Sequence, residues 1–102
     1  LETQAEPPYA KSNWQSFLVR LSRPDLQRPV MRCLQRKGVS SRRGVMCAHL
    51  EPVYADAWPV GSFPKSERAR DYNILLPFYT RMDVADVEYV VNALQESLKE
   101  AE

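Results

Sequence analysis

The sequence predicts an α+β domain in which a small sheet of three or four strands has helices packed on one face. Two segments rich in branched and aromatic residues, 13–21 and 72–76, are typical of strands, and a shorter strand is expected at 39–43. Apolar residues spaced three and four positions apart at 26–38 and 83–98 are typical of amphipathic helices. This order of elements predicts a sheet layer and a helix layer around one core.

Residues 1–12 are expected to form a lead-in or linker before a single domain that runs from 13 to 102. Pro7 and Pro8 cannot donate backbone hydrogen bonds, and this stretch is poor in apolar residues. Residues 13–21 carry apolar side chains on both faces, which favours an interior strand.

The first helix is bounded by recognisable start and stop residues. Side-chain oxygens within residues 22–25 are expected to cap its start, and Pro29 fits an early turn where a missing N–H costs least. Gly38 is expected to end the helix.

The middle of the chain is less regular. Residues 44–59 mix apolar, aromatic and proline residues without a period, which predicts a long loop with one helical turn. A short helix is expected at 65–71, opened near Pro64, and Pro77 is expected to end the strand that follows.

The last helix has the clearest signals. Asp83 and Asp86 form a capping pair and place negative charge at the positive end of the helix. The apolar residues that follow at helical spacing are expected to face the core: Val84, Val87, Val91, Leu94 and Leu98.

Composition excludes several classes of protein. The chain has 102 residues, of which 44% are hydrophobic and 26% charged, so a disordered or fibrous chain does not fit. No apolar run is long enough to span a bilayer and no secretory signal is visible, so a cytoplasmic protein without a membrane partner is expected. Two cysteines cannot make a disulfide-dense scaffold and are expected to be small buried groups.

The charge is uneven along the chain. Residues 1–51 hold nine basic and four acidic residues, whereas residues 52–102 hold five basic and nine acidic residues. The basic excess of the first half could mark an anion-binding surface. Alternatively, the two halves attract each other or belong to larger surfaces.

A stripe of three arginines defines the alternative function. Arg28, Arg32 and Arg36 are spaced four apart, which aligns them on one face of the predicted helix. They could serve a stand-alone binding module. No aromatic residues interleave with them and the pI is about 8.0, so a solvated surface is expected and nucleic acid is not.

The residues available for catalysis or metal binding are few. His49 is the single histidine, and with Cys47 two positions earlier it lacks the further ligands that structural zinc needs, so no metal site is expected. The sequence contains no G-x-S-x-G motif, and its three glycines lie well apart, so neither a serine hydrolase nor a phosphate loop is indicated.

Ligand contacts are expected at the end of the predicted strand 39–43 and in the loop that follows it. Two arginines close the expected strand 39–43, and the loop after them carries a histidine and a tyrosine. Loops that follow strands commonly carry ligand-binding groups, and an arginine fork binds carboxylate or phosphate at two points. The alternative is a surface ion pair with Glu51 or Asp56. The candidate substrate contacts are Arg42, Arg43, His49 and Tyr54.

Four stretches of the sequence together resemble a known family. They are NWQSFLVRL, LQRKGVSSRRGV, HLEPVY and SERARDYNILLPFYTRMDVADVEYVVNAL. In this order they are similar to the C-terminal segment of the DegT/DnrJ/EryC1/StrS aminotransferases, over residues 13–98. Members of that family are pyridoxal-phosphate enzymes that mostly make amino sugars.

The resemblance implies that the chain is a fragment. Family members are longer, and their large domain carries the Schiff-base lysine, the acid at the pyridine nitrogen and the phosphate-binding residues. None of those motifs is present here, and none of the four lysines lies in a buried setting that would lower its pKa. The chain is therefore expected to be a small C-terminal domain like that of fold-type I aminotransferases, to bind no cofactor itself and to be inactive alone.

The resemblance also implies partners. The missing large catalytic domain would pack on this one, and residues 44–54 would line the active-site cleft. Arg42 or Arg43 could then hold the carboxylate of an amino donor or a phosphate of a nucleotide sugar. The parent enzyme is expected to be a homodimer. An interaction domain that docks through the apolar patch left by the missing domain is a third, compatible hypothesis.

Overall fold

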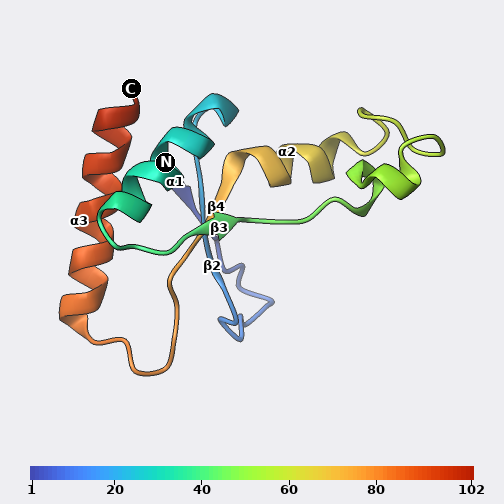
Figure 1. The fold of residues 1–102 in the computed structure, drawn as a ribbon. Coiled ribbons are helices and arrows are strands. Elements are labelled where there is room, and N and C mark those ends of the chain that lie inside the picture. Colours follow the sequence, from blue (N-terminus) through green and yellow to red (C-terminus); the bar gives the residue numbers. More distant parts are fainter.

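The computed structural model describes all residues, 1–102, and its centre is a four-stranded antiparallel sheet. The strands are β1 (Glu2–Thr3), β2 (Phe17–Arg20), β3 (Arg42–Arg43) and β4 (Asn73–Leu76), in the order β1-β2-β4-β3 (Figure 1). The predicted α+β class is confirmed, and the sheet has the larger of the two expected strand numbers.

The central pair of strands sets the length of the sheet. β2 and β4 pair over four residues, from Phe17 opposite Leu76 to Arg20 opposite Asn73. The amide of Leu21 then donates to the carbonyl of Tyr72 at 2.8 Å, which closes the ladder. The strands are therefore shorter than the segments 13–21 and 39–43 that the sequence predicts.

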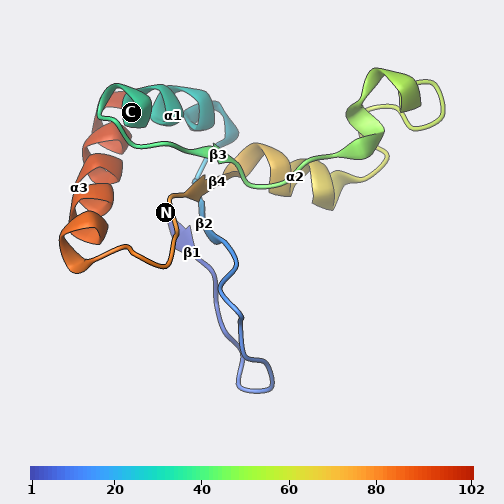
Figure 2. The same ribbon diagram turned by 60° about the horizontal axis from the view of Figure 1, so that its bottom comes forward.

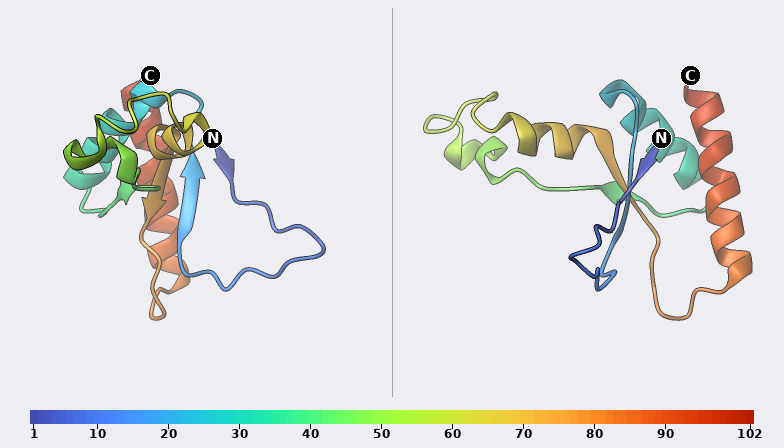
Figure 3. Two further views of the ribbon diagram at one scale, coloured as in Figure 1. Left: turned by 90° about the vertical axis from the view of Figure 1, so that its right-hand side faces the viewer. Right: turned by 180° about the vertical axis from the view of Figure 1, so that it is seen from behind.

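The expected lead-in takes part in the sheet at its beginning. Glu2 pairs with Arg20 and Thr3 with Val19, so β1 becomes an edge strand. The carboxylate of Glu2 also lies 3.1 Å from the Arg20 guanidinium, an exposed ion pair. The rest of residues 1–12 is part of a long excursion that projects from the sheet (Figure 3).

The helix α1 (Gln27–Arg36) begins differently from the prediction. A 3₁₀ turn, Pro24–Leu26, precedes it, and Arg23 occupies the cap position of that turn without a side-chain cap. The expected cap by a side-chain oxygen is therefore wrong. The physical reason is that the chain enters α1 through the 3₁₀ turn, where the Gln27 amide donates to the Pro24 carbonyl.

The end of α1 is as predicted. Gly38 has φ +72°, and its amide donates to the carbonyl of Gln35 at 3.0 Å. The amide of Val39 donates to the carbonyl of Leu34 at 2.9 Å, and both of these side chains are buried. This is the paired hydrogen bonding of a Schellman motif, which favours glycine at the left-handed position.

The capping box of α3 (Val84–Ala101) is confirmed. The Asp86 amide donates to the Asp83 carboxylate at 2.8 Å, and the Asp83 amide donates to the Asp86 carboxylate at 3.3 Å. The helix therefore begins where the sequence places its start, with two orphan amides satisfied by side chains.

The predicted core face of α3 is partly wrong. The residues it buries are Val90, Ala93, Leu94 and Ser97. Val84, Val87 and Val91 are 75%, 47% and 43% exposed, so only the C-terminal part of the predicted stripe contacts the core. The valines lie on one side of the helix, but the buried face is turned from that side toward Ala93 and Ser97, so the spacing of the valines did not fix it. A serine also occupies a core position, because its hydroxyl donates to the Ala93 carbonyl at 2.7 Å.

One apolar core joins the sheet to α1 and α3, which lie side by side (Figures 1 and 3). The buried Gln27 donates to the carbonyls of Arg70 at 2.7 Å and Asn73 at 2.9 Å, and so ties the start of α1 to the start of β4. The core comprises Val19, Leu21, Leu26, Val30, Leu34, Val39, Ile74, Val90, Ala93 and Leu94.

The short helix α2 (Pro64–Tyr72) and residues 45–63, here called the arm, lie outside the two layers. α2 leads away from the sheet and buries no residue, so it is not part of the helix layer (Figures 1 and 3). The arm contains two 3₁₀ turns, Ala48–Leu50 and Pro52–Tyr54, where the sequence predicts one helical turn in a loop.

The overall shape is extended. The radius of gyration is 15.2 Å, whereas a compact domain of this length has about 13 Å. Only 15 of 102 residues are buried. No helix is both long and apolar enough to cross a membrane.

Candidate functional site

The two candidate arginines of β3 occupy different sites. Successive residues of a strand point to opposite faces, and the hollows that these side chains line differ accordingly. Arg42 is exposed and lines a hollow of about 270 Å³ beside the end of β4, with Ser16 and Phe78. Arg43 is half-buried and lines a hollow of about 690 Å³ beside α1. A single ligand group therefore does not bind Arg42 and Arg43 from the same face of the sheet.

Neither arginine is neutralised by a carboxylate. The ion pairs of the structure do not include Arg42 or Arg43, so the alternative pairing with Glu51 or Asp56 is not observed. Both guanidinium groups are free to bind an anion.

The arginine stripe of α1 is divided by the fold. Arg28 and Arg32 line the same hollow as Arg43. Arg36 instead lies 2.9 Å from the carboxylate of Glu100 on α3. The three arginines of the stripe therefore do not act as one unit, and a strand arginine completes the cluster. The sequence could not bring Arg43 to the same hollow as Arg28, because this depends on how residues 38–41 run back from α1 to β3.

His49 is buried in the arm, where it has a structural partner. Its Nε2 lies 2.9 Å from Oε1 of Glu67 on α2, and its side chain is 8% exposed. An ionised carboxylate only accepts hydrogen bonds, so Nε2 carries the proton in this pair. The ring also packs edge-on against Phe63, with centroids 4.9 Å apart.

Glu67 is the residue that organises the base of the arm. The hydrogen bond from His49 lowers the pKa of the Glu67 carboxyl, and backbone hydrogen bonds from Gly61 and Phe63 lower it further. The Gly61 amide donates to the carboxylate at 2.8 Å. No local pattern in the sequence singles out Glu67, because its partner His49 lies 18 positions away along the chain.

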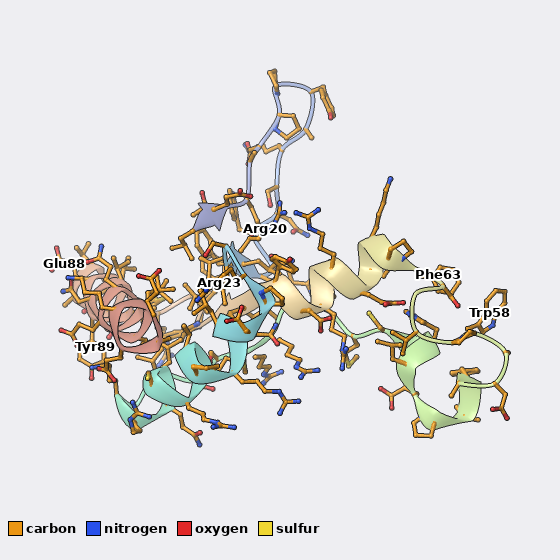
Figure 4. All side chains as sticks on the ribbon, turned by 90° about the horizontal axis from the view of Figure 1, so that it is seen from above. Arg20, Arg23, Trp58, Phe63, Glu88 and Tyr89 are labelled. Carbon is orange, nitrogen blue, oxygen red and sulfur yellow. The ribbon has the colours of Figure 1, made fainter.

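Tyr54 lies beside His49 rather than beside the arginines. It is 49% exposed and lines a hollow of about 340 Å³ in the arm. The other walls are mostly apolar, with Trp58 stacked in a tilted arrangement on Phe63 at 5.4 Å between centroids. Figure 4 shows Trp58 and Phe63 together in the arm, at the opposite end of the molecule from α3.

The cysteines are buried and unbridged, as expected. The thiol of Cys47 donates to the backbone carbonyl of Ser66, with the atoms 3.4 Å apart, and so does not pair with His49. No group of three or more metal-ligating side chains occurs in the structure.

The lysines do not fit covalent binding of pyridoxal phosphate. Such a lysine needs a lowered pKa, through burial or a cationic neighbour. Lys37 instead has a raised pKa, because it hydrogen-bonds to Glu96 and Glu100 on α3. The other three, Lys11, Lys65 and Lys99, are exposed. None of the four lysines therefore has the setting that such a lysine needs.

Comparison with known proteins decides the family. Residues 1–95 match the DegT/DnrJ/EryC1/StrS aminotransferase family. The chain belongs to this family. The resemblance noted in the sequence is thereby confirmed over nearly the whole chain.

Solved structures of aminotransferases share the fold. The aminotransferase TlmJ from Streptoalloteichus hindustanus matches 99% of the chain with a TM-score of 0.86 and 24% identity. Spr1654 from Streptococcus pneumoniae, assigned as a sugar aminotransferase, matches 84% in its apo-form with a TM-score of 0.75 and 17% identity. Its PLP-form matches 85% with a TM-score of 0.76. The chain spans only 27% of TlmJ and 22% of apo Spr1654, about a quarter of each.

Proposed function

We propose that the chain is the C-terminal small domain of a cytoplasmic, pyridoxal-phosphate-dependent aminotransferase that acts on a nucleotide sugar. The observation that carries the proposal is the match to TlmJ, which covers nearly all of this chain and about a quarter of that one. The parent enzyme would be a homodimer whose large domain binds the cofactor. The small domain alone would be inactive.

The exposed apolar surface supports the existence of a covering domain. Met46, Val53 and Val60 in the arm are 96%, 81% and 81% exposed, although a monomer rarely leaves large apolar patches in water. A second set lies at the start of α3 and just before it, with Phe78 and Val84 at 49% and 75% exposed. A large domain or a second subunit would bury these side chains.

We propose separate roles for the four candidate residues. Tyr54 would contact substrate from the apolar hollow of the arm, and His49 would position the arm through Glu67. Arg42 or Arg43 would bind an anionic group, the carboxylate of the amino donor or a phosphate of the nucleotide sugar, by a two-point hydrogen bond. These roles are orientation and electrostatic stabilisation and involve no covalent step.

The gene provides the first test of this proposal. The reading frame upstream of the Leu1 codon should encode a large domain with a cofactor-binding lysine. A start codon at or near Leu1 would contradict the proposal. So would stoichiometric cofactor absorbance near 400 nanometres when pyridoxal phosphate is added to the 102-residue chain.

Kinetics of the complete enzyme provide the second test. Arg42→Lys and Tyr54→Phe should each raise the KM for one substrate with a smaller change in kcat, because the lost contact positions a group that does not react. Arg23→Lys is the matched control, since Arg23 is exposed, pairs only with Asp25 at 3.6 Å and lies outside the hollows. Unchanged kinetics in both test variants would remove these residues from the site.

A further inference from the structure

The arm is a preformed structure that lies apart from the apolar core. The carboxylate of Glu67 fixes its base by accepting hydrogen bonds from His49 and from two backbone amides of the arm. Further out, the rings of Trp58 and Phe63 pack together with centroids 5.4 Å apart. A projecting segment with a fixed shape loses little conformational freedom when a partner covers it.

The chain exposes more surface than a compact monomer of its mass. Its accessible surface is 7700 Å², whereas a compact protein of this mass exposes about 5,900 Å². The difference of about 1,800 Å² exceeds the area of about 800 Å² that each partner buries in a standard interface. Nearly half of the large apolar side chains that are exposed lie in the arm, so the surface available for an interface is concentrated there.

The arm carries negative charge that the chain does not neutralise. Glu51 and Asp56 are exposed, and neither forms an ion pair. Residues 45–63 contain no lysine or arginine, and the single histidine is buried against Glu67. The outer side of the arm is therefore acidic, apolar and aromatic.

The outer face of α1 has the complementary chemistry. Arg28 and Arg32 are exposed one turn apart, and neither forms an ion pair. Arginine pairs with carboxylates at two points and also stacks on aromatic rings. The arm projects away from α1, so its acids do not neutralise these arginines within one copy (Figures 1 and 2).

We propose that the arm binds the outer face of α1 in a second copy of this chain, and that the two copies do so reciprocally about a two-fold axis. Such a dimer makes the same contact twice. The two acids of the arm pair with the two arginines, and Trp58 stacks on a guanidinium group. The inference goes beyond the homodimer proposed for the parent enzyme, because both surfaces belong to this chain and no large domain is needed.

The first test is analytical ultracentrifugation of the 102-residue chain over a range of concentrations. The expected result is a reversible equilibrium of monomer and dimer that weakens as salt is added, since exposed ion pairs are screened. Two double variants reverse the charge of one surface each: Arg28→Glu with Arg32→Glu, and Glu51→Arg with Asp56→Arg. Each should weaken dimerisation about tenfold or more, because like charges then face each other. Circular dichroism checks that each variant is folded.

A mixture of the two double variants is the decisive measurement. In a heterodimer, the reversed arm meets the reversed α1 at one contact, and the native arm meets the native α1 at the other. The mixture should therefore dimerise with an affinity within about threefold of the wild type. Lys99→Glu is the control, because it changes the charge of an exposed residue of α3 outside both surfaces, and it should leave the dimer unchanged.

Three results would overturn the proposal. A wild-type chain that stays monomeric at every concentration would assign the arm to another occupant, such as the missing large domain. A dimer that both charge reversals leave intact would indicate a different interface, such as the exposed valines of α3. Failure of the mixture to restore the dimer would contradict the reciprocal pairing. None of these results bears on the upstream reading frame, which tests the proposed function separately.

Discussion

The hydroxyl of Tyr89 on α3 donates to the backbone carbonyl of Lys37, 2.7 Å away, where α1 ends. The last carbonyls of a helix have no partner within the helix, so this bond satisfies a group that would otherwise need water. The ammonium of Lys37 pairs with Glu96 at 2.8 Å and Glu100 at 3.0 Å on the same helix. Lys37 is thus bound to α3 through its backbone and its side chain, and the basic first half of the chain contacts the acidic second half here.

This cluster predicts an acid limb in the stability profile. The hydrogen bond from Lys37 lowers the pKa of Glu100, with a further contribution from Cys33. The ionised Glu100 therefore stabilises the folded state at pH values above 4.5, its ordinary pKa. This stabilisation is lost as the pH falls through the folded-state pKa. Thermal unfolding followed by circular dichroism should show a weaker acid dependence in Glu100→Gln than in the wild type. Glu88→Gln, at an exposed position of the same helix, is the control. The same acid dependence in the wild type, Glu100→Gln and Glu88→Gln would refute a stabilising role of the Lys37–Glu100 pair.

At alkaline pH, stability should fall as the pH rises, which is the opposite dependence to that at acid pH. Hydrogen bonds to Glu96 and Glu100 raise the pKa of Lys37 above its ordinary value of 10.5. The stabilisation is complete below that value and is lost as the pH rises through the folded-state pKa. Lys37→Gln should remove this alkaline loss, measured by the same unfolding experiment between neutral pH and the alkaline range. Lys99→Gln, an exposed residue of α3, should retain it.

The orientation of α3 predicts a contrast between two positions. Leu94 is 4% exposed and lies in the core, so Leu94→Ala should cost about 2–5 kcal/mol of unfolding free energy. Val87 is 47% exposed, so Val87→Ala should change stability by no more than about 0.5 kcal/mol. Urea unfolding measures both. A large loss at Val87 would mean that the helix presents the face that its sequence spacing predicts.

Replacing Gly38 or Gly44 by alanine should lower the stability of the protein for different reasons. Gly38 has φ +72° and open space around its Cβ position, so Gly38→Ala should cost about 1–2 kcal/mol through backbone strain alone. A Cβ on Gly44 would lie 2.5 Å from Cβ of Asn73 and 2.6 Å from Cδ2 of Leu18, so Gly44→Ala should separate β3 from β4 and cost about 3 kcal/mol.

Asparagine distinguishes the two causes. It tolerates the left-handed region, so Gly38→Asn should recover part of the stability lost in Gly38→Ala. Gly44→Asn should recover none, because its Cβ meets the same atoms. Urea unfolding of the four variants measures this, and recovery at position 44 would show that the strand can shift to accept a side chain.

The pair of His49 and Glu67 predicts local rather than global effects. Glu67→Gln should loosen the arm, because the carboxylate accepts from His49, Gly61 and Phe63 at once. Limited proteolysis should then cleave within residues 45–63 about tenfold faster, while core amides keep their hydrogen-exchange protection. Lys65→Gln on the exposed side of α2 is the control. Loss of core protection in Glu67→Gln would mean that arm and core unfold together.

Local signals in the sequence located the elements of the fold well. Asp83 and Asp86 predict where α3 begins, and Gly38 predicts where α1 ends, because caps and left-handed positions depend on neighbouring residues. The start of α1 was not predictable in this way, since the 3₁₀ turn before it replaces the expected cap. The face of α3 was not predictable either, because burial of Ser97 depends on packing that no spacing rule contains.

The candidate site was predictable as a set of residues and not as an arrangement. Arg42 and Arg43 are neighbours in the sequence, yet strand alternation separates them into two hollows. Arg28 and Arg43 are 15 positions apart, yet the fold brings them to one hollow. Such relationships depend on how the chain runs from α1 into β3 and on the pairing of β3 with β4, which only the tertiary structure supplies.

The attachment of the arm has an evolutionary consequence. Residues 45–63 extend away from the sheet after β3, and the chain returns to the sheet through α2. None of these residues belongs to the apolar core. Substitutions, insertions and deletions within residues 45–63 therefore do not change the packing of the apolar core. Related chains of the family can therefore diversify this segment, while natural selection keeps the underlying scaffold constant.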